Sequence, residues 1–207
     1  MARAKDPLAP QPGPTPGRRD SADIVDAIVG AALDLGDPDA SVNAIAARAG
    51  VGVASLYRYF PSKGAIYAEV SRRLQRDFLT RLRAALEAPS TSLEATVVAC
   101  CRIAVEAPGA SPKLRRSLNL ALPHSWVQES ANAIFSATVT ELTRWLETRI
   151  TPAPADLRDR VFVAFAAGRG LVMMSRLLPE LAPADDVLVA QMARGAMTYL
   201  QPLTQTV

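Results

Sequence analysis

Residues 51–63 read VGVASLYRYFPSK, and this stretch decides the fold. The glycines at 50 and 52 break the short helix that precedes the stretch, and Pro61 ends the short helix that follows. We expect that second helix to run from Val53 to Tyr59. A helix, a glycine turn and another short helix together predict a helix-turn-helix.

The rest of the chain also has helical periodicity, and no segment alternates like a strand. Ser21 is expected to cap the first helix, and Thr91 and Glu94 form a capping-box pattern. Ser111 followed by proline is a further helix start. The sequence predicts an all-α fold of about nine helices, over residues 21–35, 42–49, 53–59, 62–88, 91–106, 111–122, 125–150, 155–178 and 184–200.

Composition divides the chain into three parts. Residues 1–19 hold five of the 16 prolines and few apolar residues, which predicts a disordered proline-rich tail. We expect a helix-turn-helix domain over 20–66. A helical bundle is expected over 67–207.

Charge is unevenly distributed along the chain. The net charge is +3, and residues 44–83 alone carry eight Lys or Arg against two Asp or Glu. This segment is either the docking surface for a polyanion or a basic, solvated helix face. No apolar run is long enough to span a membrane and no signal peptide is visible, so we expect a cytoplasmic location.

Few residues are suited to metal or redox chemistry. Cys100 and Cys101 are the only cysteines, and we interpret them as small apolar residues of a buried helix, with a redox sensor as the alternative. His124 is the single histidine, so neither a zinc site nor a di-iron bundle is expected. Phosphate-loop and serine-hydrolase motifs are absent from the sequence. We therefore expect no enzyme activity, metal or cofactor.

Residues 41–70, SVNAIAARAGVGVASLYRYFPSKGAIYAEV, resemble the DNA-binding domain of the TetR family of transcriptional regulators. The resemblance covers about residues 21–70 and is carried by the turn at 49–51, then 55–60, then 61–63. It implies a DNA-binding regulator whose mode is repression, and which a small-molecule effector releases from a palindromic double-stranded operator. By the resemblance, residues 20–66 are the DNA-binding domain and residues 67–207 the ligand-binding and dimerisation domain. The alternative is a helical protein-interaction module, or a small-molecule-binding bundle, without DNA binding.

The resemblance also assigns DNA contacts. It implies phosphate contacts from Ser41 with its helix N-terminus and from Tyr57, Tyr59 and Lys63. Base reading falls to the start of the third helix, at Gly52, Val53, Ala54, Ser55 and Arg58. Gly52 stands where the family commonly has a Ser or Thr cap, and Val53 and Ala54 can touch only thymine methyl groups. Arg58 is then the best candidate for a guanine contact.

In the family the last two helices form a dimer interface, so the resemblance implies a homodimer through residues 161–178 and 187–200. The effector is unknown, and its expected lining residues are Cys101, Leu118, Leu122, Trp126, Phe135, Thr138, Trp145, Phe162, Phe165, Arg169 and Met173. The alternative for the large aromatics is an ordinary core. For Arg169 we weigh an anionic or carbonyl-bearing ligand against an ion pair with Glu141 or an interface contact.

Overall fold

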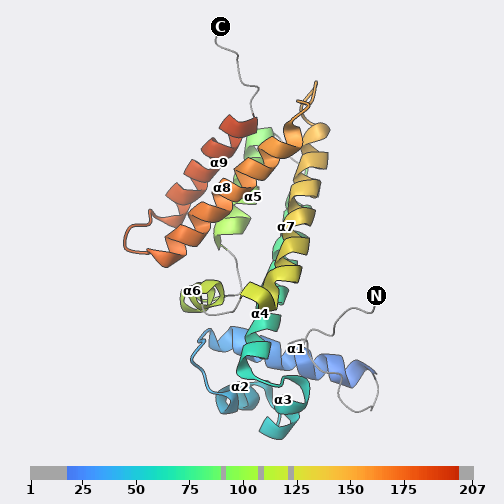
Figure 1. Ribbon diagram of the computed structural model, residues 1–207, viewed down its shortest axis with the longest axis vertical. Coiled ribbons are helices and arrows are strands. Elements are labelled where there is room, and N and C mark those ends of the chain that lie inside the picture. The colour runs from blue at the N-terminus through green and yellow to red at the C-terminus, as the bar shows by residue number, and fades with distance from the viewer. Residues whose placement is uncertain (1–17, 90–91, 107–109, 121–123, 201–207) are drawn as a thin grey trace. The chain divides into compact units, whose positions relative to one another are not determined.

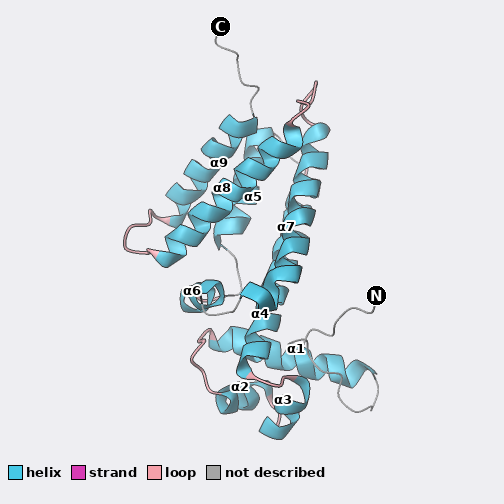
Figure 2. Ribbon diagram, in the orientation of Figure 1, coloured by secondary structure: helices cyan, strands magenta, loops and turns pink. Residues whose placement is uncertain are grey.

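The computed structural model describes residues 18–89, 92–106, 110–120 and 124–200, which form nine helices and no strand (Figures 1 and 2). The all-α prediction is therefore confirmed for these residues. The helices are α1 (Arg18–Leu35), α2 (Val42–Ala49), α3 (Val53–Tyr59), α4 (Lys63–Glu87), α5 (Leu93–Glu106), α6 (Pro112–Leu120), α7 (His124–Glu147), α8 (Leu157–Leu177) and α9 (Asp185–Leu200).

Two of the predicted helix caps differ from the structure. Helix α1 begins at Arg18, so Ser21 lies inside the helix and does not cap it. Of the tail expected over residues 1–19, Arg18 and Arg19 therefore belong to α1, and residues 1–17 lie outside the described residues. Helix α5 begins after Ser92, whose Oγ accepts a hydrogen bond from the Ala95 amide at 3.0 Å. Ser92 therefore caps the helix, while Thr91 is outside the described residues.

The chain divides into two compact units. One consists of Met1–Leu74 with Gly109–Ser130, and the other of Gln75–Pro108 with Ala131–Val207. Helices α4 and α7 each contribute residues to both units. Helix α6 belongs wholly to the first unit, together with α1, α2 and α3. The functional boundary expected between residues 66 and 67 remains a prediction.

The helix-turn-helix packs in the hydrophobic core of the first unit. Ile28, Ile45, Leu56 and Phe60 are each 0% exposed and belong to one cluster. Gly50 ends α2 in the left-handed conformation, with φ of 68°, and its amide bonds back to the carbonyl groups of α2. A side chain would strain this backbone, so glycine allows the sharp turn into α3.

The second unit is built on α5, α8 and α9, which lie side by side in Figure 1 and pack against one another. Its buried residues include Val97, Val161 and Ala193. Arg176 of α8 bonds to one end of α5 and one end of α9. Its Nη2 donates to the Val105 carbonyl at 2.7 Å, and its Nη1 pairs with Asp185 at 3.1 Å. The side chain thus satisfies a carbonyl group in the last turn of α5.

Candidate nucleic-acid interface

Helix α3 has one buried face and one exposed face. Leu56 and Phe60, four residues apart, are both 0% exposed and hold the helix against the core of the first unit. Gly52, Val53 and Ala54 at its start are exposed. The start of α3 is therefore accessible to a partner as large as a DNA duplex, because the side chains that anchor the helix lie on its opposite face.

Arg58 and Tyr57 lie on the accessible part of α3. Tyr57 is 50% exposed. The Arg58 guanidinium donates a long hydrogen bond of 3.3 Å to Ser55 Oγ and stands 5.8 Å from the centre of the Tyr59 ring. These contacts orient the guanidinium while leaving most of its five N–H donors available for a base edge or a phosphate.

Tyr59 does not lie where the sequence analysis expected it. Its side chain is only 3% exposed and belongs to the hydrophobic cluster that contains Leu56 and Phe60. This burial argues against a phosphate contact from Tyr59. The spacing of residues 56, 59 and 60 is the i, i+3, i+4 pattern of one helix face, so this burial was readable from the sequence.

Ser41 caps α2, as expected. Its backbone is extended, with φ −71° and ψ 154°, and its Oγ accepts a hydrogen bond from the Ala44 amide at 3.1 Å. Lys63, the first residue of α4, instead bonds within the protein. Its Nζ donates to the carbonyl oxygens of Pro38 at 3.0 Å and Ala40 at 3.3 Å. Two ammonium donors of Lys63 are thus used to position the segment that leads into α2, and one remains for a phosphate.

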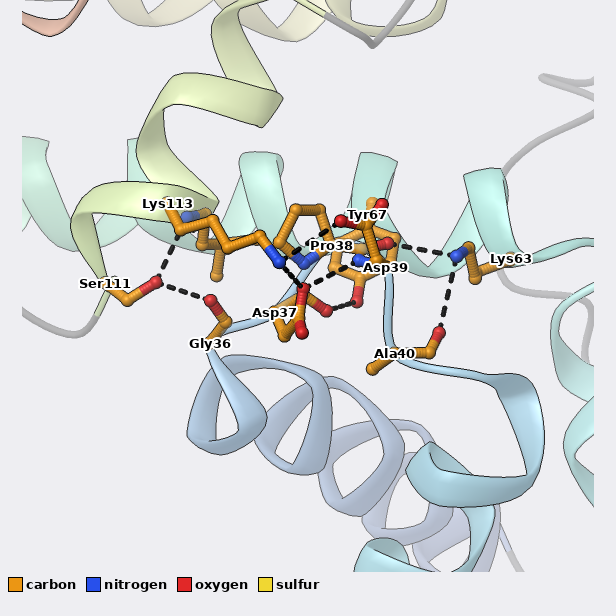
Figure 3. Close-up of polar contacts among 10 residues, drawn as sticks. Gly36, Asp37, Pro38, Asp39, Ala40, Lys63, Tyr67, Ser111 and Lys113 are labelled. Carbon is orange, nitrogen blue, oxygen red and sulfur yellow. Dashed lines mark hydrogen bonds and ion pairs between the residues drawn. The ribbon is translucent and has the colours of Figure 1, made fainter.

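The segment Gly36–Ala40 between α1 and α2 is fixed by further polar contacts, drawn in Figure 3. The Tyr67 hydroxyl donates to the Asp37 carbonyl oxygen at 2.7 Å. Burial, together with the charges of Asp37 and Asp39, raises the pKa of Tyr67 to about 12. The phenol is therefore un-ionised and able to donate throughout the physiological pH range.

Helix α6 holds the same segment from another side (Figure 3). The Ser111 hydroxyl donates to the Gly36 carbonyl and accepts from the Leu114 amide at 3.0 Å, so it also caps α6. Lys113 Nζ lies 2.7 Å from Asp37 Oδ1 and 3.1 Å from Asp39 Oδ2. Its hydrogen bond lowers the pKa of the Asp37 carboxyl.

Sequence reasoning missed this network. It identified Ser111 as a cap and Gly36 as a helix end, but nothing local connects the two residues. A Cβ added at Gly36, where φ is 60°, would lie 3.0 Å from the Ser111 Cβ. The glycine therefore serves both the backbone conformation and the close approach.

The residues expected to line an effector site are divided between different surroundings. Leu118 packs against the core of the first unit, apart from the remainder. Leu122 and the side chain of Trp126 lie outside what the structure describes. Phe162 and Met173 are exposed, by 59% and 43%. Leu118, Phe162 and Met173 are therefore not part of the buried core of the second unit.

The remaining effector candidates lie inside the second unit. Cys101, Trp145 and Phe165 are half-buried against one hydrophobic cluster. Thr138 is 1% exposed, and its hydroxyl donates to the Ile134 carbonyl at 2.8 Å. The Phe135 and Phe165 rings meet with centroids 5.7 Å apart. This pair, with Arg169 above Phe135, is the part of the candidate set that the structure brings together.

Glu141, named above as a possible partner for Arg169, pairs with another arginine. Arg83 Nε lies 2.9 Å and 3.0 Å from the two Glu141 carboxylate oxygens, and Arg83 Nη2 lies 2.6 Å from Oε1. This bidentate geometry occupies the carboxylate. The proposed Arg169–Glu141 pair is therefore wrong.

The two cysteines are half-buried in the second unit. Burial raises the pKa of Cys100 to about 12 and the pKa of Cys101 to about 11, and the neighbouring Cys101 adds to the shift at Cys100. Both thiols are therefore un-ionised at neutral pH, which disfavours a redox sensor because the thiolate is the reactive form.

Neither a metal cluster nor a membrane span is found among the described residues. No group of three or more His, Cys, Asp or Glu side chains there is arranged to hold a metal ion. Within the same ranges, every helix is too short or too polar to cross a bilayer.

Residues 34–70 match the family model described as bacterial regulatory proteins, tetR family. This match runs from the end of α1 through the helix-turn-helix and into α4. No curated protein matches the chain in sequence.

Solved structures share the fold over most of the chain. A tetR-family transcriptional regulator from Streptomyces coelicolor is 19% identical, with a TM-score of 0.66, covering 86% of this chain and 80% of that one. The fatty acid degradation regulator FadR from Bacillus halodurans is 20% identical, with a TM-score of 0.60 and coverage of 88% and 98%.

The transcriptional regulator FadR from Bacillus subtilis, solved in complex with stearoyl-CoA, is 18% identical, with a TM-score of 0.62 and coverage of 87% and 97%. At such identities the likeness establishes the fold alone. The sequence match lies on the helix-turn-helix itself, where α3 has a buried anchor and an exposed face. Residues 34–70 of the chain therefore form a helix-turn-helix that matches the TetR family model, within a fold that solved TetR-family regulators share.

Proposed function

We propose that this regulator is a homodimeric repressor, which binds a palindromic operator and leaves it when a small-molecule effector binds. The observation that carries the proposal is the exposed start of α3, at Gly52, Val53 and Ala54, opposite an anchor that is completely buried. One such helix contacts few bases, so affinity and specificity require a second copy on an adjacent half-site.

Exposed apolar side chains support dimerisation. Of the large apolar side chains exposed in the described residues, all except Leu35, Val53 and Tyr57 lie between residues 162 and 199. They include Phe162 at 59% and Leu181 at 76%. Concentrated apolar surface of this kind indicates a protein–protein interface, which here would use α8 and α9 of both copies.

The proposed DNA contacts follow from exposure. Arg58, Ser55, Val53 and Ala54 would read base edges in the major groove, with Arg58 as the guanine contact. Ser41 with the N-terminus of α2, Tyr57 and the remaining donor of Lys63 would contact phosphates. Tyr59 is left out of this set because it is buried. The regulator would act on DNA in the cytoplasm.

Release by an effector requires the second unit to change the DNA-binding unit. Helices α4 and α7 each contribute residues to both units, so a shift of either helix on ligand binding is a physical route between them. In the proposed mechanism a movement of α4 changes the spacing of the two α3 helices in the dimer. Operator and effector then oppose each other, with a coupling free energy of roughly 1–3 kcal/mol.

The test begins with selection of operators from a random duplex library. The enriched sequence is expected to be an inverted repeat, and the protein bound to it is expected to have the mass of a dimer by light scattering. A reporter gene placed behind that operator should be repressed. Enrichment of no duplex sequence, or binding as a monomer to a single half-site, would contradict the proposal.

A further inference from the structure

Arg169 of α8 stands over an aromatic pair in the second unit. Its Cζ atom lies 4.3 Å from the centre of the Phe135 ring of α7, within the range of a cation–π contact. The Phe135 ring meets Phe165, one turn before Arg169 on α8, with an interplanar angle of 57°. The two rings hold the guanidinium in place without neutralising its charge.

Arg169 has no counter-ion within the described residues, where no carboxylate or hydrogen-bond acceptor pairs with it. Two other arginines of α8 are paired. Arg160 Nε lies 2.8 Å from Asp156, and Arg176 Nη1 lies 3.1 Å from Asp185. Glu141 is occupied by Arg83. Arg169 is thus a cation held on an apolar surface with its charge uncompensated.

The surroundings of Arg169 partly desolvate its charge. The residue is exposed, yet the protein atoms around it lower the pKa of its guanidinium. An arginine remains protonated at neutral pH even so. An anion that paired with it would stabilise the charge, since a partly desolvated cation gains from an opposite charge at hydrogen-bonding distance.

A second hydrogen-bond donor in the same unit lacks an acceptor. The Trp145 Nε1 atom is buried and has no hydrogen-bond partner, although its ring packs in the hydrophobic clusters formed with α4 and α5. Buried donors are ordinarily paired. The second unit therefore has unfilled capacity to donate hydrogen bonds at Arg169 and, separately, at Trp145, and an acidic or carbonyl-bearing group can accept at either position.

We infer that Arg169 on the Phe135–Phe165 ring pair recognises an anionic group of the effector. The effector is then an amphipathic acid, with a carboxylate or a phosphate attached to an apolar body that contacts the rings. The inference rests on the proposed function only in supposing that an effector exists. It defines the chemical class of that effector.

The test compares anions with uncharged molecules of the same shape. Decanoate, decyl phosphate and decan-1-ol share an apolar chain, and 4-phenylbutyrate with 4-phenylbutan-1-ol form an aromatic pair. Titration calorimetry below the micellar concentrations measures the affinity of the full-length protein for each. Decanoyl-CoA is added to distinguish a free acid from a phosphate-bearing thioester as the source of the anion.

The wild-type protein is expected to bind the anion at least about tenfold more tightly than the matching alcohol in one or both series, as for a hydrogen-bonded charge pair. Arg169→Gln should abolish this preference, and Arg169→Lys should retain part of it. Arg158→Gln is the matched control, because Arg158 is also an exposed arginine of α8 and lies outside the ring pair. This control should keep the wild-type preference.

Two results would overturn the inference: no anion is preferred over its alcohol by the wild-type protein, or Arg169→Gln keeps the preference. A smaller oligomeric mass of Arg169→Gln with unchanged ligand preference would instead make Arg169 an interface residue, and also overturns it. Operator binding by ligand-free Arg169→Gln checks that the variant is folded. If the wild-type protein fails to bind any operator, the proposed function fails, whereas the anion preference is measured independently of DNA.

Discussion

The helix-turn-helix unit and the α8–α9 region use apolar side chains in opposite ways. In the first unit Ile28, Leu56 and Phe60 are all 0% exposed. In the α8–α9 region Phe162 is 59% exposed and Leu181 is 76% exposed. The first unit completes its core within one copy of the chain, while α8 and α9 present apolar surface that a second copy would cover. The first unit is therefore stabilised within one copy, whereas the proposed dimer would be held by α8 and α9.

The largest effect should come from the core of the first unit. Phe60→Ala is expected to lower the free energy of unfolding by about 3–5 kcal/mol, because it leaves a cavity around a side chain that is 0% exposed. Urea denaturation followed by circular dichroism measures this change. The decrease in free energy of unfolding should be the same at every protein concentration. A decrease that depends on concentration would mean that this core is not completed within one copy of the chain.

The same residue type on α8 should behave differently. Phe162→Glu places a charge within the exposed apolar surface, so we expect a shift from dimer to monomer in light scattering, with helix content unchanged. Operator affinity should fall with the dimer, most strongly at low protein concentration. A variant that remains dimeric and binds the operator normally would show that this part of α8 is not the interface.

A smaller effect is expected where polar contacts fix the connection between α1 and α2. Tyr67→Phe removes the hydroxyl that donates to the Asp37 carbonyl at 2.7 Å, and should lower the free energy of unfolding by about 1 kcal/mol. The pKa of Tyr67 is raised to about 12 in the folded protein, above its value of about 10 when unfolded.

The stabilisation by this hydroxyl should therefore be complete below about pH 10 and be lost as pH rises from about 10 towards 12. Urea titrations of the wild-type protein and Tyr67→Phe at about pH 8 and about pH 11 check the direction of this change. The difference between their free energies of unfolding should be smaller at the higher pH. A difference of constant size would mean that folding does not raise the pKa of Tyr67.

The helices were predictable from the sequence wherever the signals that begin and end them are local. The bounds of α2 and α3 follow from Ser41, Gly50 and Pro61, each within two residues of a helix end. The start of α1 was placed three residues late, because Ser21 is a good cap by type but the helix continues past it to Arg18. Capping preferences favour a position without excluding an earlier one.

Contacts between distant residues could not be predicted in the same way. Tyr67 is 30 residues from Asp37, Lys113 is 76 from Asp37, and Arg83 is 58 from Glu141. Choosing among the many carboxylates for each cation requires the packing of the helices. The sequence therefore identified Arg169 as an unusual charge, but one of the alternatives considered for it, a pair with Glu141, is excluded because Glu141 pairs with Arg83.

The measurement that tests the central claim most directly is the affinity of the protein for its selected operator and for a shuffled duplex, by fluorescence anisotropy across a salt series. We predict tight, salt-dependent binding of the operator, and a loss of about tenfold or more in its preference over the shuffled duplex for Arg58→Ala. The control Arg102→Ala, which removes an exposed arginine paired with Glu106 on α5, should match the wild-type protein. Equal affinity of the wild-type protein for both duplexes, or an unchanged preference in Arg58→Ala, would contradict sequence reading by the exposed face of α3.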